Sequence, residues 1–173
     1  MHQERLFKLK TGANHQNSIF FDTNLLILYV IGLADRNIVE QRKHKKIEHL
    51  GIEMFDLLKD FANDYDQILV TPHVLAEASN LICFHKDPEK SKIMLFFAEM
   101  LKEQIIVEIY EPSVTYIEKP IRANIFARLG LTDCAILELI SNEVTLLTAD
   151  LDLFLQATIR EMNVVNMNHL LGY

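Results

Sequence analysis

The chain is predicted to fold as a single α/β domain, residues 1–173, with a central, mostly parallel sheet of four to five strands flanked by helices. Short apolar runs alternate along the chain with longer segments in which apolar residues recur every three or four positions, the pattern of strands alternating with helices. At 173 residues, of which 50% are hydrophobic, the chain has the size of one domain and enough apolar side chains for a substantial core.

The first half of the chain contains two strand–helix units. Residues 19–21 predict a buried strand and residues 25–33 the helix that follows it. From Glu40 to Phe61, the spacing of apolar residues predicts one amphipathic helix, with Arg42-Lys43-His44-Lys45-Lys46 in its N-terminal part. Residues 67–71 predict a second strand, which ends at Pro72 because proline suits the first turn of a helix.

The second half repeats the alternation. Gly130 suits the end of one helix and Thr132 the N-cap of the next. The segment between Pro112 and Pro120 is expected to be irregular or a short helix. The remaining predicted elements are a helix over 90–103, a strand over 105–109, a helix over 121–129, a strand over 144–148, a helix over 150–161, and a short closing strand with Val164, Val165 and Met167.

Composition and charge restrict the function classes. The formal net charge of −7 argues against broad electrostatic capture of nucleic acid, so any such binding must use a local patch. The best candidate is Arg42, Lys43, Lys45 and Lys46, which a solvated helix face explains equally well.

The N-terminus is charged, and no uncharged run approaches the roughly 18 residues of a membrane span. A cytoplasmic protein without membrane contact is therefore expected. Cys83 and Cys134 form no C-x-x-C pair and are expected to be reduced core thiols, which makes zinc an unlikely metal.

Acidic residues recur where predicted strands end or helices begin: Asp22, Glu77, Asp133 and Asp150. Segments that leave the carboxyl ends of strands in an open α/β sheet converge on one crevice, so these acids can meet. An aspartate at such a corner can also be an ordinary helix cap. Capping does not explain Glu77, which lies inside a predicted helix, and the set as a whole favours a site.

Clustered carboxylates repel one another unless a cation neutralises them. Oxygen ligands suit Mg²⁺ or Mn²⁺, and Mg²⁺ commonly combines one or two carboxylates with substrate phosphate. Such an arrangement predicts phosphodiester hydrolysis, in which one ion activates water and a second ion stabilises the leaving oxygen.

The motifs Phe20-Phe-Asp-Thr-Asn24, the helical Glu77, Gly130-Leu-Thr-Asp-Cys-Ala-Ile136 and Leu146-Leu-Thr-Ala-Asp-Leu-Asp152 resemble the ordered acidic motifs of PIN-domain ribonucleases, including the toxin members of that family. The resemblance covers nearly the whole chain. It implies a PIN-like fold in which Asp22, Glu77, Asp133 and Asp150 hold the metal, with Asp152 as a fifth acid. Thr23 and Asn24 would orient Asp22 or the metal-bound water through hydrogen bonds, and Thr148 or Thr132 would do the same for the opposite acids.

The same resemblance implies a metal-dependent endoribonuclease that cuts RNA, with the toxin of a toxin–antitoxin pair as its biological role. An antitoxin protein and a second copy of the chain would then be its partners, and apolar helix faces in the Asp35–Asp66 or His85–Pro112 regions are candidate dimer surfaces.

Three alternatives stay open. A phosphohydrolase of the haloacid-dehalogenase type also begins with an apolar strand and an aspartate, but it has a second aspartate where this chain has Asn24. Dinucleotide binding is disfavoured because no Gly-x-Gly-x-x-Gly follows the first strand. A PIN-like scaffold that binds RNA or protein without cutting should have lost at least one acid, and all four are present.

Overall fold

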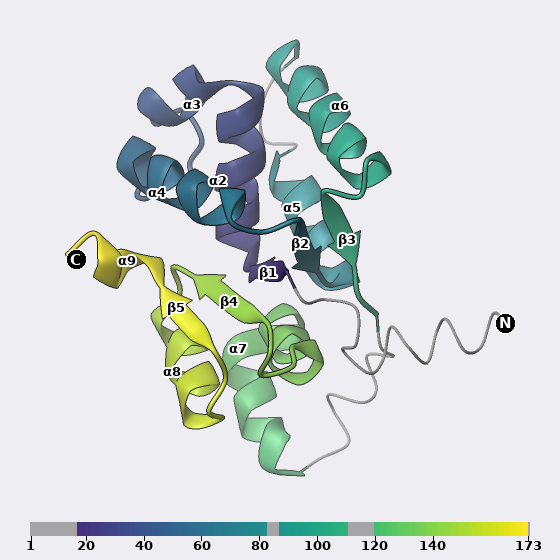
Figure 1. Ribbon diagram of the computed structural model, residues 1–173, viewed down its shortest axis with the longest axis vertical. Coiled ribbons are helices and arrows are strands. Elements are labelled where there is room, and N and C mark those ends of the chain that lie inside the picture. The colour runs from purple at the N-terminus through teal and green to yellow at the C-terminus, as the bar shows by residue number, and fades with distance from the viewer. Residues whose placement is uncertain (1–16, 83–86, 111–119, 173) are drawn as a thin grey trace, which may run out of the picture.

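Strand β1 (Ser18–Phe21) is the middle strand of a five-stranded, all-parallel sheet with the order β3-β2-β1-β4-β5 in the computed structural model (Figure 1). The other strands are β2 (Gln67–Val70), β3 (Ile106–Glu108), β4 (Thr145–Thr148) and β5 (Val164–Asn166). The structure describes residues 17–82, 87–110 and 120–172. The predicted α/β class with a mostly parallel sheet is confirmed.

Helices cover both faces of the sheet. Figure 1 shows α2, α3, α4 and α6 on one side, and α7 and α8 beside β4 and β5 on the other. This division follows from right-handed crossovers that run in one direction from β1 to β2 and β3, and in the opposite direction from β4 to β5. The helices of the described part are α2 (Thr23–Ala34), α3 (Arg36–Glu40), α4 (Gly51–Asn63), α5 (Pro72–Ile82), α6 (Glu89–Lys102), α7 (Pro120–Leu139), α8 (Leu151–Ile159) and α9 (Met167–Leu170).

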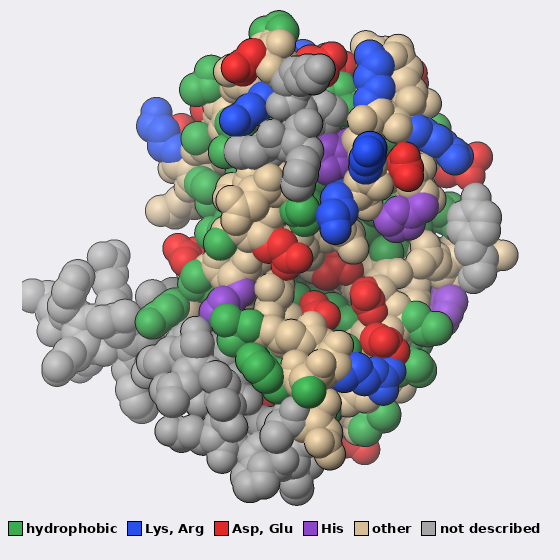
Figure 2. All heavy atoms as spheres, turned by 180° about the vertical axis from the view of Figure 1, so that it is seen from behind, with side chains coloured by type: hydrophobic (Ala, Val, Ile, Leu, Met, Phe, Trp, Pro, Cys, Tyr) green, Lys and Arg blue, Asp and Glu red, His purple; other side chains and the backbone are tan. Residues whose placement is uncertain are grey.

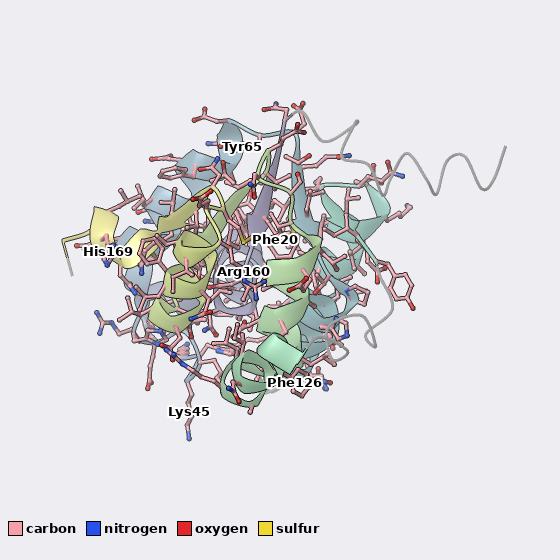
Figure 3. The ribbon with its side chains drawn as sticks, turned by 90° about the horizontal axis from the view of Figure 1, so that it is seen from below. Phe20, Lys45, Tyr65, Phe126, Arg160 and His169 are labelled. Carbon is pink, nitrogen blue, oxygen red and sulfur yellow. The ribbon has the colours of Figure 1, made fainter. Side chains whose placement is uncertain are left out.

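The core is built around β1 and α2. Ile19, Phe20 and Phe21 are completely buried, because neighbouring strands flank β1 and helices cover both of its faces. Helix α2 is apolar on every side from Leu25 to Ile31, as suits a helix enclosed by the sheet, α4, α5 and α6. Figure 3 shows Phe20 in the interior of the molecule. The β1–α2 corner is therefore held by the best-packed part of the structure.

The strand order changes direction at β1. Strands β2 and β3 follow on one side of β1 and β4 and β5 on the other, with Phe21 paired to Leu147. In parallel sheets, ligands bind outside the carboxyl ends of the strands at such a switch point. Asp22 directly follows β1 and Asp150 comes shortly after β4, so both lie at this edge.

The predicted helix over residues 40–61 is wrong in its first half. Helix α3 ends at Glu40 and α4 begins only at Gly51. Arg42 has a φ of 49° and Gly51 a φ of 67°, values that a right-handed helix does not permit. Ile47 and Leu50 are nevertheless buried, which is why their spacing resembled a helix. The basic run therefore lies in the α3–α4 connection and not on a helix face.

One smaller prediction is corrected at the C-terminal end and another is confirmed. Met167 starts α9 instead of belonging to the last strand, because the Asn166 side chain caps that helix by accepting from Asn168 N. The two helices expected on either side of Gly130 form one element, α7, which is broken at Gly130 with φ 80° and ψ −175°. Glycine adopts this conformation with no steric cost, so the predicted break at Gly130 is confirmed.

Cys134 is buried and its sulfur forms no disulfide, as expected. Cys83 and the segment between Pro112 and Pro120 lie outside the described residues. Within residues 17–82, 87–110 and 120–172, no helix combines the length and apolar character needed to cross a membrane.

Gly32 is predicted to be required by the packing of α2 on α4. A Cβ at this position would lie 2.3 Å from the Phe55 ring, so Gly32→Ala should lower the free energy of unfolding by about 1–3 kcal/mol in urea denaturation. Phe55→Leu in the same chain should recover part of this loss. Additive effects of the two substitutions would show that the contact is not the cause.

Candidate functional site

Asp22 is a buried carboxylate at the end of the central strand, with a side chain that joins β1 to β4. Its Oδ1 accepts from Leu25 N at 2.8 Å and caps α2. Its Oδ2 accepts from the Thr148 hydroxyl at 2.5 Å and from Ala149 N at 3.0 Å. Burial raises the pKa of Asp22 above its usual range, although these three hydrogen bonds act in the opposite direction. Asp22 is thus held in one orientation between two chain segments distant in sequence.

Thr148 connects Asp22 to Asp150. The same hydroxyl that donates to Asp22 accepts from Asp150 N at 2.9 Å. The exposed Asp150 side chain caps α8 through Oδ1, which accepts from Leu153 N at 2.9 Å. Capping therefore does explain part of the role of Asp22 and of Asp150. Thr148, expected to orient the acids opposite Asp22, donates to Asp22 itself.

Glu77 reaches the same corner from α5. Its Oε2 accepts from the hydroxyl of Thr23 at 3.0 Å, and Thr23 is the residue after Asp22. Glu77 is exposed while Thr23 is buried, so the fixed hydroxyl orients the free end of a long side chain. The sequence predicted that Thr23 would orient Asp22 or a metal-bound water, whereas its hydroxyl bonds to Glu77.

Asp133 brings the set together. It lies in α7 just after the break at Gly130, and it is half-buried. Burial raises its pKa to about 7, and the charges of Asp150, Asp22, Glu77 and Asp152 add to this increase, in that order. The separate acidic motifs are therefore close enough for each carboxylate to oppose ionisation of Asp133. Figure 2 shows acidic side chains gathered in the middle of this face.

Asp133 differs from Asp22 in its hydrogen bonds. Among the described residues, no donor bonds to the Asp133 carboxyl, whereas three donors bond to Asp22. A carboxylate with a raised pKa and no donor is one that a cation would stabilise most.

The remaining predicted residues lie around this group. Asp152 forms an ion pair with Arg128 of α7, and both side chains are about half exposed. Asn24 and Thr132 are half-buried, and no hydrogen bond joins either to the acids in the part of the chain that the structure describes. The exposed side chains of Arg42, Lys43, Lys45 and Lys46 lie in the α3–α4 connection, which His44 anchors to α5 through a 3.0 Å contact of Nε2 with Leu81 O.

Two contributors were not predicted from the sequence. The Ala149 main-chain N–H bonds to Asp22, and Asn168 Nδ2 of α9 donates to Ala149 O at 2.9 Å. A main-chain donor leaves no signal in a sequence. Asn168 follows strand β5, as Asp22 and Asp150 follow β1 and β4. That position was the one feature of the sequence that could have predicted its contribution to the site.

The residues suit a hard divalent cation in chemistry and in charge. They supply only carboxylate oxygens, and their mutual repulsion is what a cation would relieve. In the described part of the chain, no three His, Cys, Asp or Glu side chains are arranged so that they could hold a metal ion directly. Mg²⁺ does not need such a cage, because it retains several waters and uses one or two carboxylates with substrate phosphate. The donor chemistry and the charge of the group fit the implied ion, while the described side chains do not form a cage of three direct ligands.

In comparisons with known proteins, no family model, no curated protein and no solved structure matches the chain. The resemblance to PIN-domain ribonucleases therefore depends on the acidic motifs and on their placement in the fold.

Asp133 is predicted to make the metal-free protein less stable as the pH rises. The pKa is about 7 in the folded chain and about 3.9 in the unfolded one, so the native state binds more protons between these values and the free energy of unfolding falls with increasing pH. Asp133→Asn should be more stable than the original chain by about 1–2 kcal/mol at pH 8, allowing for solvent screening. Urea denaturation in chelator measures this difference.

The advantage of Asp133→Asn should shrink to less than half at pH 5 and vanish below about pH 4. Asp60→Asn, at an exposed position of α4, is the control and should show no such trend. An advantage that is constant with pH would contradict the assigned cause.

Thr148→Val is predicted to loosen the corner, because it removes a buried donor to Asp22 and an acceptor for Asp150 N. The expected loss in the free energy of unfolding is about 1–3 kcal/mol. Thr145→Val on the same strand is the matched control, since its hydroxyl accepts only an exposed bond from Asn163. Equal losses from the two substitutions would show that the Asp22 contact contributes nothing specific.

Proposed function

We propose that the chain is a metal-dependent endoribonuclease of the PIN-domain type, which hydrolyses phosphodiester bonds in RNA with Mg²⁺ or Mn²⁺ held by Asp22, Glu77, Asp133 and Asp150. The observation that carries the proposal is the effect of the other acids on Asp133. Burial raises its pKa to about 7, and the charges of the other acids add to this increase, at the edge of the sheet where ligands of α/β folds bind. A group of acids with only a structural role would gain nothing from this repulsion.

The protein's own residues fix the site before any ion arrives. Asp22 has about four lone-pair positions and three donors, so it offers one further position to a cation without losing its orientation. Thr23 directs Glu77 toward the same place. The bound ion would polarise the phosphate and lower the pKa of the attacking water. Asp133 would then be ionised, because the ion neutralises the negative charges of the neighbouring acids.

A nucleic acid is the substrate that the surroundings favour. The basic side chains Arg42, Lys43, Lys45 and Lys46 lie in the connection that packs against α5, the helix of Glu77. Figure 3 shows Lys45 extending away from the body of the protein. In Figure 2, Lys and Arg side chains lie beside the acidic group on the same face. A phosphate backbone can therefore bind the basic connection while another phosphate lies at the acids.

The alternatives have less support. The strand order is that of the first five strands of the dinucleotide-binding fold, but the first turn contains Asp22-Thr23-Asn24 and no glycine. Asn24 also stands where a haloacid-dehalogenase-type phosphohydrolase has its second aspartate. The non-cleaving scaffold is disfavoured because all four acids are kept and grouped.

The biological role that we attach to this activity is that of a toxin inhibited by an antitoxin protein, in the cytoplasm and as a homodimer. This part of the proposal depends on the resemblance of the acidic motifs to the toxin members of the PIN-domain family.

The proposed activity predicts cleavage of labelled single-stranded RNA by the purified chain in Mn²⁺ or Mg²⁺ and none in chelator. Asp22→Asn and Asp133→Asn should each reduce cleavage at least about 100-fold, since each removes charge that holds the ion. Thr23→Val should cost about tenfold, because it only frees Glu77. Asp60→Asn is the control and should cleave as the original chain does.

A second measurement does not depend on activity. Mn²⁺ should raise the Tm of the original chain at pH 8, because it binds the folded state alone, and should do so much less for Asp133→Asn. Equal cleavage in chelator would reject the metal mechanism. A Tm shift without RNA cleavage would leave the metal site and reject the ribonuclease.

A further inference from the structure

A positively charged side chain, that of Arg128, lies at the border of the acidic group. Arg128 belongs to the part of α7 before Gly130, and Asp133 belongs to the part after it. The Arg128 guanidinium pairs with Asp152 in the first turn of α8. Asp152 lies two residues after Asp150, which caps the same helix, so this ion pair borders the acids. Figure 2 shows basic side chains both above and below the acidic group.

The ion pair contributes little to the fold. The Arg128 and Asp152 side chains are 53% and 52% exposed, and exposed pairs stabilise proteins by only about 0–1 kcal/mol. Asp152 is favoured in the first turn of α8 by the helix dipole even without a partner. Arg160 makes a useful contrast, because its less exposed guanidinium joins Leu137 O and Glu138 and so connects α8 to α7. The Arg128 pair can open at small cost.

An RNA phosphate that approaches the acids meets strong repulsion. A bound ion offsets part of it, and a positive side chain at the border offsets more. Guanidinium is suited to this task because its parallel N–H donors match two phosphate oxygens. A phosphate at this position would replace the Asp152 carboxylate as the partner of Arg128, one anionic oxygen acceptor for another.

We propose that Arg128 binds the phosphate next to the bond that is cut, and that Asp152 holds Arg128 in place while no RNA is bound. The inference rests on the proposed ribonuclease function. In this arrangement Asp152 is not a metal ligand. Arg128 and the basic connection at Arg42–Lys46 then contact the RNA strand on opposite sides of the acids.

The test measures binding of a fluorescent single-stranded oligoribonucleotide to the full chain by anisotropy, in Ca²⁺ and over a range of salt concentrations. Arg128→Ala should weaken binding about five- to tenfold and reduce the slope of log Kd against log salt by about 0.7, the value for one phosphate contact to a single strand. Arg128→Lys should lose less affinity and keep the slope. Lys102→Ala removes the same charge from α6, at a position that is 81% exposed, and should change neither quantity.

Asp152→Asn separates the proposal from a merely structural role. It breaks the same ion pair, yet it should tighten RNA binding a few-fold because Arg128 loses its competing partner. In the double variant with Arg128→Ala this gain should disappear. A gain in RNA affinity that persists in the double variant would mean that Asp152 acts only as a negative charge. It would contradict the proposal that an RNA phosphate replaces Asp152 as the partner of Arg128.

Two further outcomes are decisive. If Arg128→Ala binds RNA as the original chain does, with an unchanged salt slope, the inference is wrong while the ribonuclease proposal stands. If the original chain neither binds nor cuts RNA, the proposed function fails and the inference fails with it.

Discussion

The structure depends on one buried carboxylate. Asp22 follows a strand with no exposed apolar side chain and is itself only 4% exposed. A charge in such a place is costly unless donors compensate it. The donors come from α2, which it caps, and from the end of β4, more than a hundred residues later. The requirement to satisfy Asp22 therefore fixes how the two halves of the sheet meet at the switch point.

The turn after β4 is ordered by the same requirement. The Thr148 hydroxyl that donates to Asp22 also accepts from Asp150 N. Ala149 donates its N–H to Asp22 while Asn168 holds its carbonyl from the far side. Asp150 thus stands at the end of a turn whose main chain is held at Ala149 N, Ala149 O and Asp150 N. Positions set by main-chain bonds are stiffer than positions set by side chains alone, which suits a site that must keep several like charges close together.

Much of this arrangement was predictable from the sequence, for definite physical reasons. Strands buried on both faces are apolar throughout, so β1 and β4 were visible as short runs. The convergence of Asp22 and Asp150 followed from parallel strands alone. The helix proposed over residues 40–61 was wrong because Ile47 and Leu50 are buried at helical spacing in a segment that Arg42 and Gly51 turn out of helical geometry. Apolar spacing reports burial, and it identifies a helix only where the backbone permits one.

The partner of Asp152 could not be predicted in the same way. Arg128 belongs to the part of α7 before the break at Gly130, and the relative direction of two helix segments at a glycine with φ 80° is not encoded in their periodicity. The acids consequently divide by how they are compensated. Asp22 has donors, Asp152 has a cation, and Asp133 has neither within the described residues. In the described part of the chain, the fold thus contains one half-buried carboxylate without a donor or a cation, next to carboxylates that have one or the other. Selection for folding alone would remove this local electrostatic conflict. That conflict is the strongest physical reason to look for a cationic ligand at Asp133.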